Sequence, residues 1–174
     1  PIWGIEPNPG PNSNVSGAYS LLTQNYRGLS DKKKAISLLR KLQSGPQVKI
    51  ACLQETHVID PYAVQNFVSG RIVLDNGERN QRGTAIVIPN QFQVTQTKVS
   101  GFGRWALAAC THIGTNWKVI VASVYAPNNH NESADFFQNF FLALDDFCYE
   151  VAVDLNTQIV VAGDFNFVDH PDYY

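Results

Sequence analysis

The feature that most constrains the fold is an apolar run near the end of the chain that gives way abruptly to polar residues. Residues 160–166 read Val-Val-Ala-Gly-Asp-Phe-Asn. A short β-branched run predicts a buried strand, and residues two apart on an extended chain share one face, so Asp164 and Asn166 can reach one ligand together. Sheets of α/β proteins place their sites at such strand ends. A polar turn after a strand has the same appearance, so this stretch alone does not establish a site.

Three earlier stretches make the same change from apolar to polar residues. They are Leu-Thr-Gln-Asn at 22–25, Cys-Leu-Gln-Glu-Thr at 52–56 and Ser-Val-Tyr-Ala-Pro-Asn at 123–128. In this order the four stretches resemble the endonuclease/exonuclease/phosphatase superfamily of metal-dependent phosphodiesterases, which includes exonuclease III and the abasic-site endonucleases. Within it, the chain is most similar to the endonuclease domain of non-LTR (LINE-type) retrotransposons, from about residue 20 to residue 166.

The resemblance implies a DNase I-like α/β fold, and the order of elements agrees with it. Strands are expected at 18–24, 48–54, 71–74, 84–88, 94–99, 105–112, 117–125 and 158–163, and helices from 31, from 60 towards 67, and over 133–153. Strands and helices mix without strict alternation. This mixture predicts two mixed β-sheets packed as a sandwich and flanked by helices.

Two helix features carry specific expectations. Ser30 is expected to cap the helix that begins at Asp31. The helix over 133–153 carries a wide apolar stripe, which predicts core packing rather than a platform for stacking bases. The stripe consists of Phe136, Phe137, Phe140, Phe141, Leu144, Phe147, Cys148 and Val151.

Residues 1–17 are rich in Pro, Asn, Gly and Ser and have no hydrophobic period. We expect a flexible leader there, followed by one domain over 18–174. Residues 5–11 resemble the tail of a ribosome-skipping peptide. Gly4 stands where those peptides carry Asp, so a Pro-rich linker is the expectation.

Composition narrows the classes of function. The net charge of −2 argues against a protein that holds nucleic acid by bulk positive charge, but not against an enzyme whose acids hold cations. The three cysteines lack metal-ligand spacing, which indicates reduced thiols in an intracellular protein. No apolar run is long enough to span a membrane, so no membrane partner is expected. A member of this superfamily that cleaves DNA would act in the nucleus.

The expected metal is Mg²⁺, with Mn²⁺ as a substitute. Mg²⁺ prefers oxygen ligands and often takes only one or two protein carboxylates. Glu55 follows a buried strand, and the resemblance assigns the glutamate of this Gln-Glu-Thr motif as the principal metal ligand. The alternative is a strand-end glutamate paired with an Arg or Lys. The resemblance also places Asn25 at the metal site or the scissile phosphate.

The resemblance assigns the reacting groups as well. Asp164 matches the aspartate that positions or deprotonates the attacking water, and Asn166 matches an amide that helps to hold the phosphate. Tyr125 matches a tyrosine that contacts the phosphate or stabilises the transition state, where a phenol can donate a hydrogen bond to developing negative charge. Asn25, Glu55, Tyr125, Asp164 and Asn166 are therefore the candidate catalytic residues.

Three further residues are candidates for contact with phosphate or DNA. Arg27 stands where relatives often carry Asp or Asn, so a phosphate contact replaces a contact around the metal. Arg104, in a Gly-Arg pair before a strand, contacts the DNA backbone or forms a structural ion pair. Asn128 binds phosphate or caps its loop, and the sequence leaves both alternatives open.

The essential histidine of the superfamily lies in a Ser-Asp-His motif at the end of the last strand. This chain has Val-Asp-His-Pro at 168–171, too soon after Asn166 to be that strand. We therefore interpret His170 as a loop residue and expect the C-terminal part of the domain to be missing.

The function that the resemblance implies is Mg²⁺-dependent hydrolysis of a DNA phosphodiester. The enzyme would nick target DNA so that a reverse transcriptase module of the same polyprotein can prime synthesis there. An abasic-site repair endonuclease, or another phosphodiesterase of the superfamily, is the alternative within this class. An inactive fragment that binds nucleic acid or a protein partner is the alternative from a different class.

Overall fold

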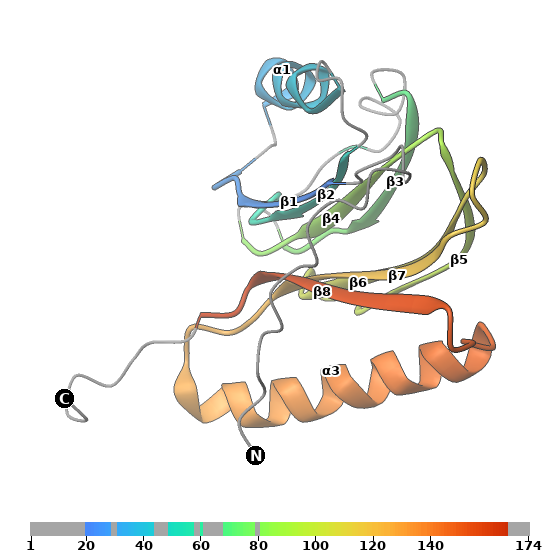
Figure 1. The fold of residues 1–174 in the computed structure, drawn as a ribbon. Coiled ribbons are helices and arrows are strands. Elements are labelled where there is room, and N and C mark those ends of the chain that lie inside the picture. Colours follow the sequence, from blue (N-terminus) through green and yellow to red (C-terminus); the bar gives the residue numbers. More distant parts are fainter. Residues whose placement is uncertain are drawn as a thin grey trace, which may run out of the picture.

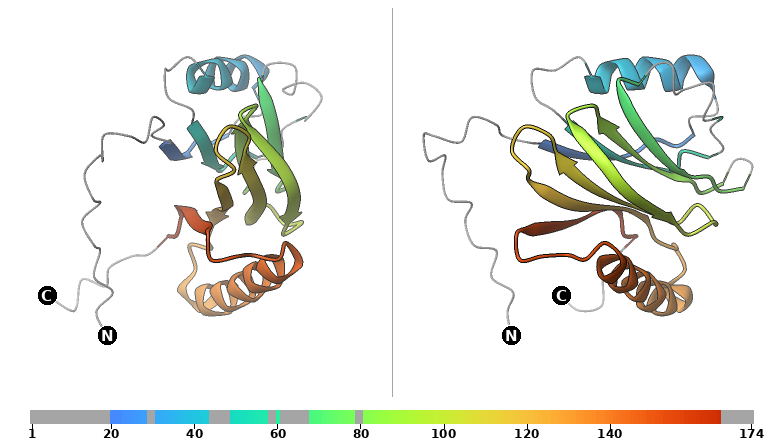
Figure 2. Two further views of the ribbon diagram at one scale, coloured as in Figure 1. Left: turned by 45° about the vertical axis from the view of Figure 1, so that its right-hand side comes forward. Right: turned by 90° about the vertical axis from the view of Figure 1, so that its right-hand side faces the viewer.

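In the described part of the chain, two four-stranded β-sheets stack face to face, and one helix lies against the outer face of each (Figure 1). The computed structural model describes residues 20–28, 31–43, 49–57, 60, 68–78 and 81–166. Two further views show the same layers from other sides (Figure 2). The predicted sandwich of two mixed sheets with flanking helices is confirmed.

The first sheet is built from the first half of the chain, in the strand order β1-β2-β4-β3. Its strands are β1 (Ser20–Asn25), β2 (Lys49–Gln54), β3 (Gly70–Asp75) and β4 (Thr84–Pro89). β1 and β2 run parallel, whereas β4 is antiparallel to β2 and β3. A parallel pair needs a long crossover, and here it contains α1 (Lys32–Gln43), which packs Ala35, Leu38 and Leu39 on the outer face of the sheet.

The second sheet follows in simple chain order, β5-β6-β7-β8. Its strands are β5 (Phe92–Val99), β6 (Trp105–His112), β7 (Lys118–Tyr125) and β8 (Thr157–Asp164). β5, β6 and β7 form an antiparallel meander, including the predicted hairpin between β6 and β7. β8 then pairs parallel to β7 after a crossover that contains α3 (His130–Glu150).

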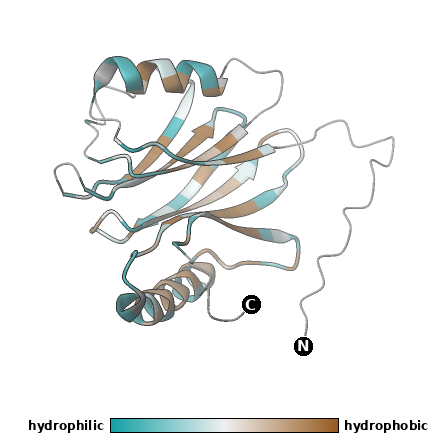
Figure 3. Cartoon of the chain, turned by 90° about the vertical axis from the view of Figure 1, so that its left-hand side faces the viewer, coloured by the Kyte–Doolittle hydropathy of each residue, from teal (hydrophilic) through white to brown (hydrophobic). Residues whose placement is uncertain are grey.

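Each central strand contributes to two apolar layers, because successive side chains point to opposite faces. On β4, Ile86 and Ile88 belong to the layer between the sheets, while Ala85 and Val87 belong to the layer under α1. On β6 the inner layer receives small residues, among them Ala106. Figure 3 shows the result as mainly hydrophobic strands and as helices with alternating hydrophilic and hydrophobic bands.

The two parallel pairs bring four strand ends to one place. β1 and β2 end at Asn25 and Gln54, and the paired strands β7 and β8 end at Tyr125 and Asp164. Asn25 of the first sheet hydrogen-bonds Asp164 of the second, so both pairs end at the same edge of the sandwich. The polar residues that follow these strands in the sequence are therefore neighbours.

The cap of α1 differs from the prediction by one residue. Asp31 Oδ1 accepts the backbone N–H groups of Lys33 at 2.7 Å and Lys34 at 3.3 Å, so α1 begins at Lys32. A carboxylate satisfies two free N–H groups at a helix start as well as a hydroxyl does. Asp31 therefore caps the helix.

The long helix α3 begins three residues before the predicted start, and its apolar stripe is narrower than predicted. Asn129 caps it by accepting the backbone N–H of Asn131 at 3.1 Å. Phe140 and Phe147 are fully buried, but Phe141 is 54% exposed. The stripe is core packing as predicted, except at its Phe141 edge.

Some predictions concern parts of the chain that are not described. These are the leader over 1–17, its peptide-like segment at 5–11, the expected cap residue Ser30 and, apart from Asp60, the helix expected over 60–67. His170 also lies outside the described residues. Among the helices that the structure describes, none combines the length and the apolar character needed to cross a membrane.

The adjacent pair Phe140 and Phe141 tests the packing of α3. Phe140→Ala removes a buried ring and should lower the free energy of unfolding by about 3–5 kcal/mol. Phe141→Ala, one position along the same helix, removes a half-exposed ring and should cost no more than about 1 kcal/mol. Urea unfolding followed by circular dichroism measures both. Equal losses for the two variants would contradict this orientation of the helix.

Candidate active site

One asparagine joins the two carboxylates at the meeting point of the sheets. Asn25 Nδ2 donates hydrogen bonds to Glu55 Oε1 at 2.9 Å and to Asp164 Oδ2 at 3.0 Å. Ionised carboxylates only accept, so the part of the amide that faces both must be its NH₂ group. The amide oxygen accepts the backbone N–H of Arg27 at 3.1 Å. Asn25 thus presents hydrogens, and not its oxygen, to the carboxylates.

Tyr125 completes this cluster from the second sheet. Its hydroxyl donates to Glu55 Oε1 at 3.1 Å, the same oxygen that Asn25 contacts. Burial raises the pKa of the Tyr125 phenol above its ordinary value, and the charge and hydrogen bond of Glu55 raise it further, while Arg104 acts in the opposite direction. Tyr125 therefore stays protonated, and able to donate, through the physiological range.

The backbone of Glu55 is held in an unusual conformation. Its φ angle is 51°, in the left-handed region that costs a residue other than glycine roughly 1–3 kcal/mol. Backbone hydrogen bonds stabilise it. The carbonyl of Glu55 accepts the backbone N–H of Gly28 at 2.7 Å, and the N–H of the next residue, Thr56, donates to the carbonyl of Gly83 at 3.1 Å. This turn directs the carboxylate of Glu55 towards Asn25 and Tyr125.

Asp164 and Asn166 lie together, but not as alternate residues of one extended strand. β8 ends at Asp164, and Asn166 has a φ angle of 48°. The chain turns back, so that the N–H of Asn166 donates to Asp164 Oδ1 at 3.2 Å and its Nδ2 donates to the carbonyl of Ala126 at 2.7 Å. The predicted proximity is found, and it comes from this turn.

Gly163, just before Asp164, allows the close approach of β8 to β7. A Cβ atom at this position would lie 2.0 Å from the carbonyl oxygen of Val124, a fixed backbone atom. Any side chain would push the two parallel strands apart. The position of Asp164 relative to Tyr125 therefore depends on a glycine at 163.

A chain of buried polar side chains connects the sheets beneath the cluster. Gln54 is 1% exposed, donates to Ser123 Oγ at 3.2 Å and accepts from Thr23 Oγ1 at 3.3 Å. Ser123 Oγ lies 2.6 Å from Thr84 Oγ1, which in turn donates to the carbonyl of Leu53 at 3.0 Å. This set of side chains, called here the polar seam, links β1, β2, β4 and β7.

A cleft of about 400 Å³ opens beside Glu55, and its lining also includes Tyr125, Arg82, Arg104 and Asn128. Arg104 donates from one guanidinium nitrogen to the carbonyls of Tyr125 and Ala126, at 3.3 and 3.2 Å, and lies 5.3 Å from the centre of the Tyr125 ring. Among the described residues Arg104 forms no ion pair.

The other two candidate phosphate contacts differ in their position relative to the cleft, since Asn128 lines it and Arg27 does not. Asn129, and not Asn128, caps α3, which leaves Asn128 as an exposed residue of the cleft wall. Arg27 is exposed and outside the cleft lining, and its backbone N–H holds Asn25.

Sequence reasoning missed Arg82. The pairing of β2 with β4 is what indicates it. Because Gln54 pairs with Thr84, the residues before Thr84 lie beside those after Gln54. Arg82 has a φ angle of 59°, and its carbonyl accepts the N–H of His57 at 2.8 Å. Only the strand pairing, which the sequence does not show, brings Arg82 to the cleft.

The side chains fit an oxygen-seeking cation better than zinc. No group of three His, Cys, Asp or Glu side chains able to hold a metal occurs within the described ranges. Zinc sites need three or four protein ligands, whereas Mg²⁺ often takes one or two carboxylates and completes its shell with water and substrate. Glu55 accepts both of its described hydrogen bonds on Oε1, so Oε2 is the oxygen free to bind a cation.

Comparison with known proteins now assigns the family. A model of the endonuclease/exonuclease/phosphatase family matches residues 12–174. The chain belongs to this family. No curated protein matches the sequence.

Solved structures agree on the fold. Truncated TDP2 from Caenorhabditis elegans is similar with a TM-score of 0.58 and 20% identity, covering 80% of this chain and 58% of that one. TDP2 from D. rerio, complexed with a single-strand DNA product, has a TM-score of 0.56 and 17% identity, covering 86% and 60%. The chain therefore spans about three fifths of the length of these structures. At such identities the similarity shows the fold alone.

The pKa of Tyr125 offers a test of the cluster. We expect its phenol to titrate above pH 10, because burial and Glu55 both favour the protonated form. Glu55→Gln should lower the pKa towards the ordinary value without reaching it, since burial is the largest cause and remains. Absorbance titration, with a Tyr125→Phe protein subtracted to remove the other six tyrosines, measures it.

The matched control for that titration is Glu150→Gln. Glu150 pairs with Lys98 on the surface of the second sheet, so this variant should leave the Tyr125 titration unchanged. A Tyr125 phenol that ionises at or below pH 10 in the unaltered chain would contradict the cluster geometry.

Proposed function

We propose that this chain is the Mg²⁺-dependent endonuclease domain of a LINE-type retrotransposon and nicks target DNA. The observation that carries the proposal is the cluster at the strand ends, where Asn25 bridges Glu55 and Asp164 and Tyr125 donates to Glu55. This cluster contains two carboxylates, one amide and one phenol beside a polar cleft. The hydrolysis of a phosphodiester needs such a combination of cation site, base and hydrogen-bond donor.

Glu55 is the residue that would hold the metal, through Oε2, with Mn²⁺ able to replace Mg²⁺. When bound, the cation would neutralise charge on the phosphate and its leaving oxygen. Asn25 supports this role by fixing the other oxygen of Glu55 and one oxygen of Asp164. For Asn25 to be a ligand itself, its amide would have to turn over and break both of these hydrogen bonds.

Asp164 is the proposed base for the attacking water. Its oxygens accept from Asn25 Nδ2 and from the backbone of Asn166, and these two contacts fix the direction in which the carboxylate can accept a proton. Tyr125 and Asn166 are the proposed donors to the phosphate. Both donate to protein oxygens in this structure, and both would have to redirect a hydrogen towards substrate.

DNA is the proposed substrate. Arg104 and Asn128 line the cleft that begins at Glu55, where they can contact backbone phosphates. TDP2 from D. rerio, which has the same fold, is described in complex with single-strand DNA. Arg27 lies outside this cleft lining and could contact DNA only beyond it.

The retrotransposon assignment rests on the sequence motifs. In that setting a reverse transcriptase of the same polyprotein would use the nick as its primer, and the reaction would take place in the nucleus. An abasic-site nuclease would share the cluster. A duplex containing one abasic site, compared with an intact duplex, distinguishes the two by which is cut faster.

Nicking of supercoiled plasmid tests the proposed reaction. The unaltered chain should relax plasmid in Mg²⁺ or Mn²⁺ and be inactive in EDTA. Asp164→Asn should reduce the rate by about 10²–10⁴-fold, as expected for loss of a general base. Glu55→Gln should reduce it by at least about a hundredfold and should also weaken Mg²⁺ binding in calorimetry.

Asp146→Asn is the matched control, because Asp146 is an exposed carboxylate on α3 outside the cleft lining. Its rate should equal that of the unaltered chain. Metal-independent nicking, or equal rates for the Asp164 and Asp146 variants, would refute the proposed chemistry. Binding of DNA without any cleavage would favour the non-catalytic alternative.

A further inference from the structure

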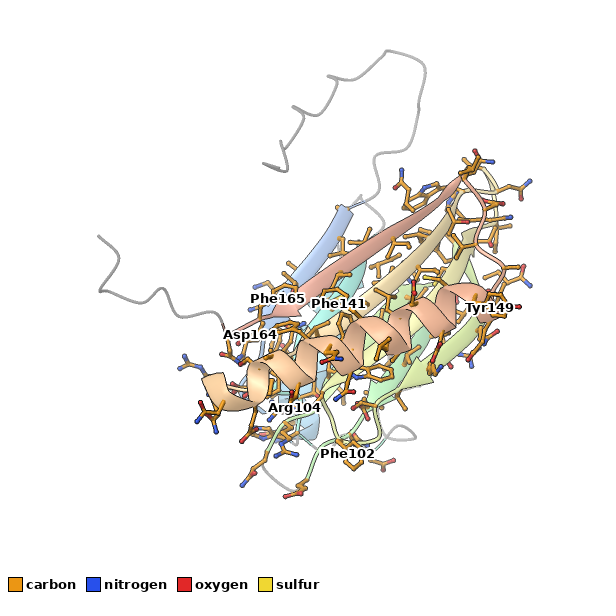
Figure 4. The ribbon with its side chains drawn as sticks, turned by 90° about the horizontal axis from the view of Figure 1, so that it is seen from below. Phe102, Arg104, Phe141, Tyr149, Asp164 and Phe165 are labelled. Carbon is orange, nitrogen blue, oxygen red and sulfur yellow. The ribbon has the colours of Figure 1, made fainter. Side chains whose placement is uncertain are left out.

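One aromatic side chain, two residues from Arg104 of the cleft, is largely exposed to solvent. Phe102 is 70% exposed and lies between Gly101 and Gly103 in the loop that joins β5 to β6. Among the residues that the structure describes, the other large exposed aromatics are Phe141 and Tyr149, which belong to α3. In Figure 4 the labelled residues Asp164 and Arg104 lie near the start of α3, Tyr149 lies near its other end, and Phe102 follows beyond Arg104.

The backbone of the loop that carries Phe102 is fixed by hydrogen bonds to Asp75. Asp75, which is 2% exposed at the end of β3, accepts hydrogen bonds from the hydroxyl of Ser100 and from the N–H groups of Gly101 and Arg104, the latter two at 3.0 and 3.1 Å. Ser100 Oγ in turn accepts the N–H of Phe102 at 3.1 Å. A buried carboxylate thus fixes the backbone on both sides of an exposed ring.

Gly103 locks the same loop against the neighbouring turn. Its φ angle is 70°, and a Cβ atom there would lie 2.5 Å from the Cα of Gly77. Its carbonyl accepts the N–H of Gly83 at 3.0 Å. The ring of Phe102 is therefore presented to solvent by a loop with little freedom to fold it back onto the protein.

Positively charged residues lie close to Phe102 along the chain and in the neighbouring turn, at Arg104 and Arg82. Arg104 is two residues from Phe102, so their Cα atoms are at most about 7 Å apart. Arg104 and Arg82 line the same cleft, and neither forms an ion pair with a described residue. Burial lowers the pKa of Arg104 most, and the charge of Arg82 lowers it further, while Tyr125 and Glu132 act in the opposite direction. An anion bound between the two guanidinium groups would reduce the repulsion between them.

We propose that Phe102 and Arg104 form a nucleotide subsite, in which Phe102 stacks on an unpaired base and Arg104, with Arg82, binds the adjoining phosphate. The proposal rests on the proposed function, because it places this nucleotide on the strand that enters the cleft beside Glu55. The ligand class is a single-stranded segment, or a duplex with a base unpaired next to the cleavage site. A base within intact duplex is stacked on its neighbours and cannot cover the ring.

Nucleic acid explains the combination better than a protein partner does. Single strands are held by exposed aromatic side chains combined with nearby basic groups, where stacking accepts any base and the basic groups follow the backbone. A protein partner would need a larger apolar surface to dock. Here the flanking residues are glycines and a serine, which offer almost none.

Binding of oligothymidine in EDTA tests the subsite without cleavage. The probes are a dye-labelled oligothymidine of about ten nucleotides and an oligomer of equal length whose sugars carry no bases. Fluorescence anisotropy of the 174-residue chain should show tighter binding of the thymidine oligomer. Phe102→Ala should weaken that binding by roughly five- to a hundredfold, the usual effect of losing one stacked base. Its affinity for the base-free oligomer should not change.

Two further variants separate stacking from general apolar contact. Phe102→Trp keeps an aromatic ring and should bind the thymidine oligomer at least as tightly as the unaltered chain. Phe102→Leu keeps apolar surface without a ring and should behave like Phe102→Ala. Tyr149→Ala, which removes an exposed aromatic on α3, should bind both oligomers normally. These three substitutions and Phe102→Ala replace exposed side chains, so they should leave the thermal unfolding midpoint unchanged.

The outcomes are distinct for the subsite and for the proposed function. If Phe102→Ala binds the thymidine oligomer as tightly as the unaltered chain, while that chain still nicks plasmid, the stacking proposal is wrong and the nuclease stands. Equal loss on both oligomers would also overturn it, since the effect would then not depend on a base. If the unaltered chain binds neither oligomer and nicks nothing, both proposals fail together.

Discussion

The hydrogen bond from Gln54 to Ser123 joins the two sheets at the level of the candidate site, and the geometry above it depends on that connection. An apolar core gives little specificity to the sliding of one sheet over the other, whereas a buried amide without partners is costly. The polar seam is satisfied only when Gln54, Ser123 and Thr84 meet. It therefore favours the one arrangement of the sheets that also brings Glu55 to Tyr125.

Above the seam, the site is organised by donors shared between acceptors. The amide of Asn25 donates hydrogen bonds to the carboxylates of both Glu55 and Asp164. The carbonyl of Ala126 accepts hydrogen bonds from both Arg104 and Asn166. Residues that the sequence suggests as phosphate contacts thus already stabilise the turn after β7. A bound substrate would compete with the carbonyl of Ala126 for the hydrogens of Arg104 and Asn166. The same side chains would therefore both stabilise the site and bind the substrate.

Most strands and the residues of the cluster could be predicted from the sequence. The position of Arg82 and the backbone turns of the site could not, for physical reasons. Apolar runs give the strands to within a few residues, and the polar residues after four of them indicate the cluster of Asn25, Glu55, Tyr125 and Asp164. Periodicity does not reveal partners, however, so the place of Arg82 depends on the pairing of β2 with β4. Nor does it reveal backbone conformation. The left-handed turns at Glu55 and Asn166 arise from tertiary hydrogen bonds, which local propensity does not contain.

The burial of Asp75 has a consequence for the speed of recognition. The loop from Ser100 to Arg104 is anchored to this carboxylate, so bending it would leave a buried charge without its donors. Such a surface is already in its binding conformation, so no slow rearrangement of the loop has to accompany binding. Association would then be governed by diffusion and by the attraction of the arginines, and would slow as added salt screens that attraction.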